Sequence, residues 1–414
     1  MVGRSPAGSV MQLRLVDTLS GRAKAVRPHR GRTVGLYVCG PTVYDAAHVG
    51  HGRTYLFFDI ARRVLEAEGY LVRHVMNVTD LEDKIDSRAA LLGISSRTLA
   101  RAEERSFFRD LGAFGNLPPK FRPRASEFVP DMIAIARALE RTGRVRRSGG
   151  EWRYEAPDRA DGENFPAGSD LARHAVQEPG HPFPKASDWE RSFVVWKQLS
   201  RPLPSWPSPW GRGAPGWHLQ CFAMSSRLLG VPVDLHGGGR DLVYPHHFAE
   251  NEISLALRGA PFAPVFLHTG LVLQGGSKMS KSTGNLVPLR EALAAYGAGE
   301  LRWYLMGRPY RDRFPWSEAA ARKAAEEFDL LRSALRGWLA GRNGGRIGGE
   351  RVRALAQEVR RALADGLATD RVVAELRQFA AEVAASSGGV PKGERREVRA
   401  ALRTVEQRLG LALT

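Results

Sequence analysis

The stretch that decides the fold is VGLYVCGPTVYDAAHVGH, residues 34–51. Its first five residues are rich in β-branched and aromatic side chains and end at Cys39, before a Gly-Pro turn, which predicts a strand. After the turn, apolar residues recur at helical spacing over 57–65, and a second apolar strand is expected at 70–76. A strand, a helix and a strand in this order form a βαβ unit, so the two strands are expected to be parallel.

This βαβ unit predicts where a functional site lies. Open parallel sheets bind their ligands outside the carboxyl ends of the strands. Polar and reactive residues follow both predicted strand ends, namely Cys39, His48, His51, Thr79 and Asp80. We therefore expect a doubly wound α/β sheet of the Rossmann type, with its site at that edge.

The rest of the chain predicts a split sheet domain followed by helices. A Gly-, Pro- and charge-rich segment separates two helical stretches from a second group of strands, which is typical of an insertion. Beyond residue 290 the pattern predicts helices alone, interrupted by the linker GRNGGRIGG. In chain order, helices are expected at 95–114 and 127–141, the insertion at about 145–190, strands at 232–236 and 264–273, and the last helices at 350–385 and 393–410.

Composition excludes several classes of protein. No apolar run among the 414 residues approaches the ~18–20 needed to cross a bilayer, and the N-terminus is a poor secretory signal. Two cysteines far apart in a long chain do not form the disulfide framework that is typical of secreted proteins. A cytoplasmic enzyme is therefore expected. The net charge of +17 suits a polyanionic partner such as nucleic acid, although an Arg-rich composition can also reflect codon bias.

Two short motifs indicate phosphate chemistry. In HVGH, His48 and His51 flank Gly50 at a predicted helix start, where the backbone and the helix dipole favour anions. In KMSKS, Lys278 and Lys281 can neutralise charge that develops on phosphates. Each motif alone is weak. Together and in this order they resemble the HIGH and KMSKS motifs of class I aminoacyl-tRNA synthetases, which implies ATP-dependent adenylation of a carboxylate.

The two cysteines suggest a metal site. Cys221 is expected near the start of a helix, and His246 and Glu250 lie four residues apart on one face of a predicted helix over 246–258. Thiolate, imidazole and carboxylate are all zinc ligands. Taken singly, a buried cysteine is a small core residue and a His–Glu pair is ordinary helix surface.

A larger set of motifs resembles cysteinyl-tRNA synthetases across roughly residues 34–320. In order, the motifs are CGPTVYD, HVGH, NVTDLEDKI, FVVWK, SWPSPWGRGAPGWH, DLHGGGRDLVYPHH and KMSKSTGN. Carried over position by position, the family's zinc ligands fall on Cys39, Cys221, His246 and Glu250. The resemblance also implies catalytic roles for His48, His51, Lys278 and Lys281, ATP contacts by His48, Gly50, His51 and Lys281, and an amino-acid pocket lined by Thr79, Trp217, His218 and Asp241. Trp217 could alternatively be core packing.

The implied cofactors are one Zn²⁺ and the Mg²⁺ that accompanies ATP. The implied partners are L-cysteine, ATP and tRNA, and no membrane is expected. An apolar pocket distinguishes near-isosteres such as cysteine and serine by only ~1–3 kcal/mol of binding free energy, whereas a zinc ion selects cysteine by binding its thiolate. We therefore expect no editing domain. The implied organisation is a first catalytic half (1–120), an insertion (121–200), a second half with the KMSKS loop (201–290), a helical junction (291–340) and a short C-terminal helical domain (341–414).

The chain departs from the family pattern at two places near the expected metal. The family usually has GWHxEC, whereas this chain has Gln220 before Cys221. The family's HHENE motif reads HHFAENE in this chain, which is two residues longer. The carboxylate ligand is Glu250 if four residues are counted from His246, and it is Glu252 if the two ENE sequences are aligned. The helical i, i+4 spacing favours Glu250.

The acceptor has two candidates. The chain ends near residue 414 without the small domain that many synthetases use near the anticodon. A related ligase, which joins cysteine to a glucosaminyl-inositol in mycothiol synthesis, has this compact length and a similar ending, VEQRLGLAL. DKI, DLHGGG and HGRTY resemble the synthetase instead, so tRNA is the expected acceptor. A third hypothesis, an idle paralogue that binds tRNA or nucleotide, is disfavoured by the intact lysines and metal ligands.

Overall fold

The central sheet is parallel, as the sequence predicts. The computed structural model describes residues 11–157, 192–198, 204–279, 284–341, 347–386, 388–391 and 393–414. Four parallel strands pair in the order β10-β9-β3-β4, which are Phe266–Thr269, Leu235–Gly239, Thr33–Val38 and Leu71–Met76. The helix α1 (Val49–Ala67) connects β3 to β4 and completes the predicted βαβ unit.

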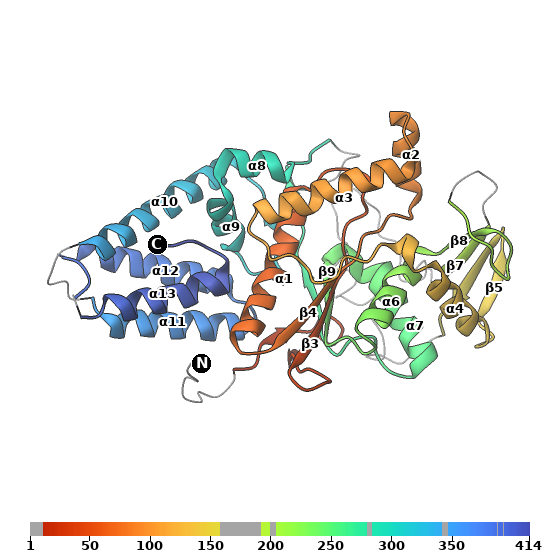
Figure 1. Cartoon of the computed structure of the whole chain (residues 1–414), viewed down its shortest axis with the longest axis horizontal. Helices are drawn as coiled ribbons and strands as arrows, with labels where there is room; N and C mark the ends of the chain where they lie inside the picture. The colour runs from red at the N-terminus through yellow and green to blue at the C-terminus, as the bar shows by residue number, and fades with distance from the viewer. Residues whose placement is uncertain are drawn as a thin grey trace.

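Both faces of this sheet are covered, which makes the fold doubly wound. Successive side chains of a strand point to opposite faces, so Leu36 and Val38 join the core with α1, whereas Tyr37 joins the other core. The second core contains α6 (Trp217–Leu228) and α7 (Phe248–Arg258). In Figure 1 the sheet occupies the middle of the molecule, a helical region lies on the left and a small antiparallel sheet on the right.

The strand β9 begins three residues later than the predicted strand 232–236 and includes three glycines. A Cβ atom on Gly237 would lie 1.8 Å from the backbone oxygen of Leu267 in β10. Glycine therefore permits the close approach of the two strands. Because glycine has low β-propensity, the sequence pattern placed this strand too early in the chain.

The predicted strand 264–273 is two strands. It divides after β10, and β11 (Val272–Gln274) joins a small sheet with β12 (Ser277–Lys278) and β13 (Phe314–Pro315). The prediction of helices alone beyond residue 290 is therefore wrong at β13, a strand of two residues.

The region between the two parts of the sheet contains helices and an antiparallel sheet. Its helices are α2 (Asp83–Leu92), α3 (Ser96–Ala113) and α4 (Val129–Glu140). Its sheet is β5 (Val145–Ser148), β6 (Glu151–Glu155), β7 (Ser192–Gln198) and β8 (Gly213–Pro215). A short antiparallel pair, β1 (Arg14–Val16) and β2 (Ala23–Ala25), precedes the main sheet. The middle of the predicted insertion, residues 158–191, lies outside the described residues.

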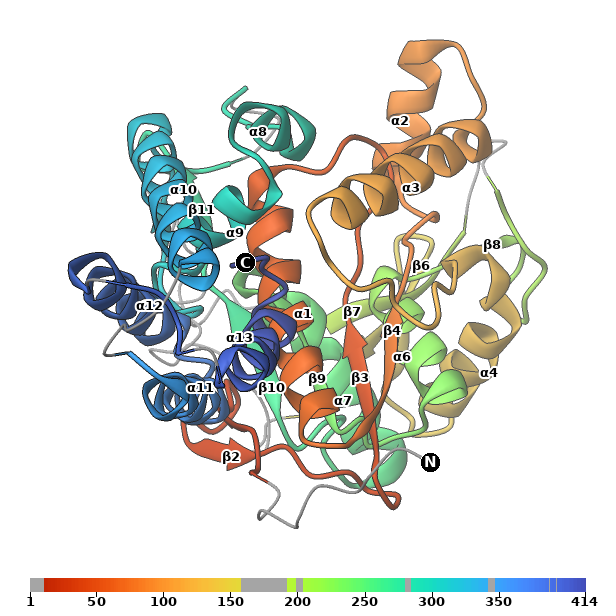
Figure 2. The same ribbon diagram turned by 60° about the vertical axis from the view of Figure 1, so that its left-hand side comes forward.

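The carboxyl-terminal part is helical. Its helices are α8 (Leu289–Tyr296), α9 (Ala298–Met306), α10 (Glu318–Ala340), α11 (Gly349–Ala364), α12 (Thr369–Ala385) and α13 (Arg395–Leu409). The single helix predicted at 350–385 is two helices, because Gly366 and Leu367 adopt positive φ angles of 79° and 51° and end α11. Figure 2 shows α11, α12 and α13 grouped beside α1. Among the described helices, none has the length and apolar character needed to cross a membrane.

The helix α1 connects the sheet to this helical bundle through charged side chains. Glu68, which follows α1, forms ion pairs with Arg360 of α11 and Arg408 of α13 at 2.5 and 3.4 Å. Asp59, near the middle of α1, pairs with the buried Arg302 of α9 at 2.7 Å and with Arg63 at 2.8 Å. Burial alone would raise the pKa of Asp59, but the two guanidinium charges outweigh it and lower that pKa.

We expect the Arg302→Met variant to lose about 3–5 kcal/mol of unfolding free energy, because it leaves the buried Asp59 carboxylate short of its closest cation. Urea unfolding of the purified protein measures this loss. The matched control is Arg322→Met on the exposed face of α10, for which a change within about 0.5 kcal/mol is expected. A loss below about 1 kcal/mol for Arg302→Met would contradict a stabilising role for this pair.

Candidate active site and metal centre

A cavity of about 600 Å³ lies at the carboxyl edge of the parallel sheet. It brings together residues that are far apart in the sequence and that come from the strand ends, from the start of α1 and from α6. The site residues predicted from the sequence that line it are Cys39, His48, Gly50, His51, Thr79, Trp217, Cys221, Asp241 and His246. The expected edge of the sheet therefore carries a cavity that contains most of the predicted site.

The other four predicted residues are not among the described residues that line this cavity. His218 lines a neighbouring cavity of about 510 Å³, and its Nδ1 lies 3.0 Å from Nδ1 of His246. Glu250 is fully buried behind His246. Lys278 belongs to β12, and Lys281 lies outside the described residues.

The start of α1 forms one wall of the cavity. The backbone N–H of His48 donates to Nδ1 of His51 at 3.3 Å, and the two imidazole rings stack with centroids 3.8 Å apart. A Cβ atom on Gly50 would lie 2.8 Å from the His48 ring, so glycine is needed for this packing. The N-terminus of a 19-residue helix, flanked by two histidines, provides a site for a phosphate group.

The two cysteines meet at the other end of the cavity. Their sulfur atoms lie 3.7 Å apart, although the residues are separated by 182 positions in the chain. A tetrahedral zinc ion with Zn–S bonds of about 2.3 Å places two sulfur ligands about 3.8 Å apart. The distance from His246 Nε2 to Glu250 Oε1 is 3.5 Å, close to the roughly 3.4 Å edge that tetrahedral nitrogen and oxygen ligands give. Among the described residues, Cys39, His246 and Glu250 belong to one group whose ligand atoms all lie within 4.8 Å of one another, whereas Cys221 approaches this group through Cys39 and is not a member of it. The donor types present are those that zinc prefers.

The structure distinguishes the two candidate carboxylates. Ligand atoms of Cys39, His246, His247 and Glu250 all lie within 4.8 Å of one another. Glu252 is also buried, but it does not belong to this group of the described residues. The geometry thus supports Glu250. Its Oε2 also lies 2.8 Å from Nε2 of His236, whose Nδ1 lies 3.1 Å from the Tyr37 carbonyl oxygen.

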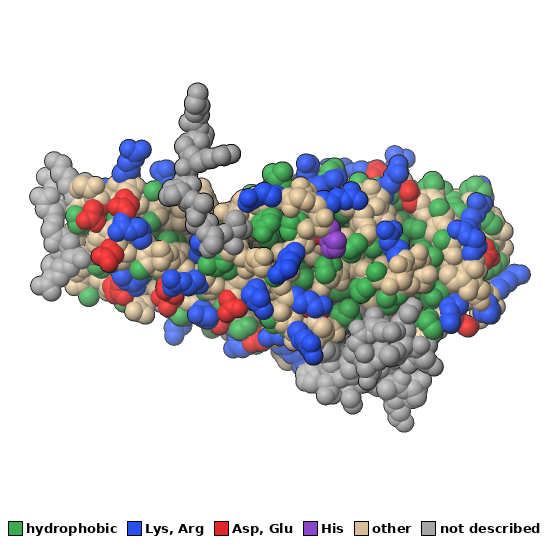
Figure 3. All heavy atoms as spheres, turned by 90° about the horizontal axis from the view of Figure 1, so that it is seen from below, with side chains coloured by type: hydrophobic (Ala, Val, Ile, Leu, Met, Phe, Trp, Pro, Cys, Tyr) green, Lys and Arg blue, Asp and Glu red, His purple; other side chains and the backbone are tan. Residues whose placement is uncertain are grey.

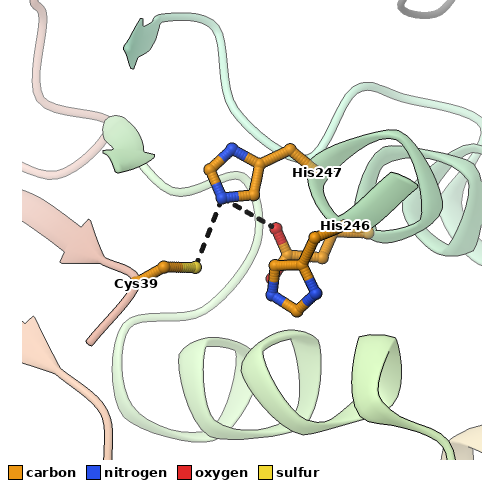
Figure 4. A group of neighbouring side chains, drawn as sticks. Cys39, His246 and His247 are labelled. Carbon is orange, nitrogen blue, oxygen red and sulfur yellow. Dashed lines mark hydrogen bonds and ion pairs between the residues drawn. The ribbon is translucent and has the colours of Figure 1, made fainter. Parts of the chain in front are cut away.

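His247 was missed by the sequence analysis. Its Nε2 lies 3.3 Å from the Cys39 sulfur (Figure 4). Its Nδ1 lies 2.6 Å from Nε2 of His268. Consecutive residues of an α-helix diverge by about 100°, so the predicted helix over 246–258 paired His246 with Glu250 and gave no reason to include His247. Here α7 begins at Phe248, and both histidines precede it, just after a kink at Tyr244, whose φ and ψ of −137° and 139° are not helical. The HH pair itself was the available signal.

Burial determines the protonation of this cluster. Desolvation lowers the pKa of His246 and His247 well below the usual value, which leaves neutral imidazoles with a lone pair for a metal. Desolvation also raises the pKa of Cys39 and of Glu250. A dication bound between these groups reverses that effect, because it favours the thiolate and the carboxylate. The donor set is therefore suited to a soft divalent cation.

Residues 25–326 match the family described as tRNA synthetases class I (C) catalytic domain. The chain belongs to the class I cysteinyl-tRNA synthetase family. This family membership confirms the resemblance inferred from the sequence motifs. The cysteine–tRNA ligase of Aeropyrum pernix is 40% identical to this family member over 325 residues, which cover 78% of this chain and 68% of that protein. The cysteine–tRNA ligase of Thermococcus onnurineus is 39% identical over 329 residues, with the same two coverages.

Solved structures confirm the class I fold of this cysteinyl-tRNA synthetase family member. Mycobacterium tuberculosis methionyl-tRNA synthetase in complex with methionyl-adenylate superposes with a TM-score of 0.62 at 16% identity, covering 92% of this chain and 90% of that one. A leucyl-tRNA synthetase ternary complex from Agrobacterium radiobacter K84 gives a TM-score of 0.64 at 11% identity, covering 92% and 84%. At these identities the likeness concerns the fold alone.

Proposed function

We propose that this chain is a cysteine–tRNA ligase, which activates L-cysteine with ATP and transfers it to the 3′ end of cysteine tRNA. Its family membership supports this function. The observation that carries the proposal is that one cavity contains both the paired histidines at the start of α1 and the two cysteine thiols. A phosphate site and a thiol-selective site are the two parts that cysteine adenylation requires.

In the first step, a carboxylate oxygen of cysteine attacks the α-phosphorus of ATP. The bond from that phosphorus to the bridging oxygen breaks, and pyrophosphate leaves. The protein positions the reactants and stabilises the developing charge. His48, Gly50 and His51 contact ATP at the N-terminus of α1, while Lys278 and Lys281 neutralise the leaving pyrophosphate. Mg²⁺ enters with ATP.

The amino-acid end of the cavity selects cysteine. One zinc ion, when bound, would accept the substrate thiolate as a ligand and so separate cysteine from serine. The residues that would hold it are Cys39, Cys221, His246 and Glu250. Thr79, Trp217 and Asp241, which line the cavity, would surround the substrate, and His218 would support the pocket from behind through its contact with His246. The Trp217 ring stacks on His246 with centroids 4.3 Å apart, so packing on a ligand and forming the pocket wall are compatible roles.

In the second step, a hydroxyl of the terminal adenosine of tRNA attacks the carbonyl carbon of the adenylate, and AMP leaves. The net charge of +17 favours binding of the polyanion. Figure 3 shows Lys and Arg side chains along the whole visible face, with Asp and Glu concentrated toward the helical-bundle end. Such contacts to phosphates position a tRNA without reading its sequence. We place the reaction in the cytoplasm, where tRNA is charged.

A transfer assay tests this function. Purified protein, ATP and radiolabelled cysteine are offered cysteine tRNA or glucosaminyl-inositol in separate reactions. We expect label on the tRNA only, and none when the terminal adenosine of the tRNA has been removed. Label on the aminosugar alone would show that the acceptor was assigned wrongly. Absence of any adenylate, measured as pyrophosphate exchange, would favour the idle paralogue.

A further inference from the structure

The amide of Gln220 connects two parts of the site. Gln220 lies in the first turn of α6, directly before Cys221, and its side chain is buried. Its Nε2 donates a hydrogen bond to the carbonyl oxygen of Leu81 at 3.0 Å. This is the position at which the sequence departs from the usual glutamate of the family.

Leu81 belongs to the loop 77–82, which follows β4 and contains the pocket residue Thr79. The amide side chain of Asn77 in this loop accepts from the backbone N–H of Gly40 at 2.8 Å and donates to Oγ1 of Thr79 at 3.1 Å. The backbone N–H of Thr79 donates to the Pro41 carbonyl at 3.0 Å. The loop is thus bonded to the turn that follows Cys39.

This turn and the loop are also in close contact. A Cβ atom on Gly40 would lie 1.7 Å from the backbone oxygen of Asn77. A shift of the loop therefore displaces the residue next to Cys39. Because the two cysteines are 182 positions apart, tertiary contacts such as these help to hold their sulfur atoms at 3.7 Å.

The Gln220 bond completes a connection from one cysteine to the other. It runs from Cys39 through Gly40 and the loop to Leu81, and from there through Gln220 to Cys221. Only a hydrogen-bond donor can make the link to Leu81. An amide has this donor, whereas a carboxylate would place two acceptors against each other.

We propose that Gln220 is a positioning residue for cysteine binding, which holds α6 and the Thr79 loop at the separation that the amino-acid pocket requires. The inference rests on the proposed function, since it concerns the same pocket. It assigns Gln220 a role at the cysteine end of the cavity and none at the ATP end, where α1 forms the wall.

The test compares Gln220→Met, which keeps the side-chain length and removes the donor, with Gln220→Glu, which replaces the donor by an acceptor. For both variants we expect the KM for cysteine in pyrophosphate exchange to rise roughly tenfold, the effect of one lost hydrogen bond. The KM for ATP should stay within about twofold, because the wall formed by α1 is unchanged. Gln378→Met is the matched control, since this exposed amide donates to Glu382 within α12, and no change is expected.

An unchanged KM for cysteine in both variants would overturn the proposal. Equal rises in the two KM values would also overturn it, because they would indicate a general structural defect. The dissociation constant for cysteine, measured by calorimetry on the zinc-loaded wild type and variants, separates this inference from the proposed function. A wild type that binds cysteine without activating it would refute the ligase, while the variants' affinities would still decide the role of Gln220.

Discussion

Replacing Cys221 by alanine is expected to lower the zinc content from about one ion to below ~0.1 per chain and to reduce cysteine activation at least ~1000-fold. Structural zinc sites contribute roughly 10–16 kcal/mol, so losing one of two soft ligands removes a large part of that energy. Without the cation, burial keeps the pKa of Cys39 and of Glu250 raised, so both groups stay protonated and are poor metal ligands. Metal analysis and cysteine-dependent pyrophosphate exchange, with serine as the competing substrate, measure the effect.

The matched control for this variant is Ser225→Ala, one turn further along α6. Its hydroxyl is buried and donates to the Phe222 carbonyl at 3.0 Å, so one polar atom is again removed from the same helix. We expect the control to retain zinc and the preference for cysteine. Unchanged discrimination in Cys221→Ala with metal still bound would refute the assignment of the zinc ligands.

Replacing His51 by alanine is expected to slow adenylate formation by about 100- to 1000-fold, the range found when one preorganised donor is removed from a developing anion. Nδ1 of His51 accepts a hydrogen bond from the backbone N–H of His48, and the two rings stack. The variant therefore also removes two contacts that hold His48 in position. Single-turnover formation of cysteinyl-adenylate measures this rate. Zinc content and the affinity for cysteine should not change, because the cysteine thiols lie at the other end of the cavity.

The control for this variant is His29→Ala, which removes a partly exposed histidine before β3, at the amino edge of the same sheet. Its adenylation rate should match the wild type within about twofold, because distant sites are independent. If His51→Ala lost zinc, or if its affinity for cysteine fell in parallel with the rate, the division of the cavity into a phosphate end and a thiol end would be wrong.

The sheet could be predicted from local pattern where the pattern was strong. The βαβ unit was recognised because β3 and β4 are rich in β-branched residues and α1 has regular apolar spacing. The strand β9 was displaced in the prediction because its three glycines have low strand propensity and are there for close packing. The division between α11 and α12 was missed because Leu367 adopts a positive φ angle that its side chain does not favour.

The site could be predicted only as a set of residues. Motif order identified the cysteines and the paired histidines, and helical spacing favoured Glu250 over Glu252. His247 was missed because its approach to Cys39 is a contact across 208 positions, beside a kink at Tyr244 that the sequence pattern does not show. The partner of Gln220 could not be inferred either, because Leu81 is 139 positions away and contributes a backbone oxygen, which every residue has.

The position of α1 has a mechanical consequence. One end of this helix carries His48 and His51, and the other end reaches Glu68, which Arg360 and Arg408 hold against the bundle. At 1.5 Å per residue the helix is about 28 Å long, so a tilt of ~5° imposed at its far end would displace its first turn by about 2.5 Å. A force applied to the bundle would therefore move the first turn of α1, where we propose that ATP binds.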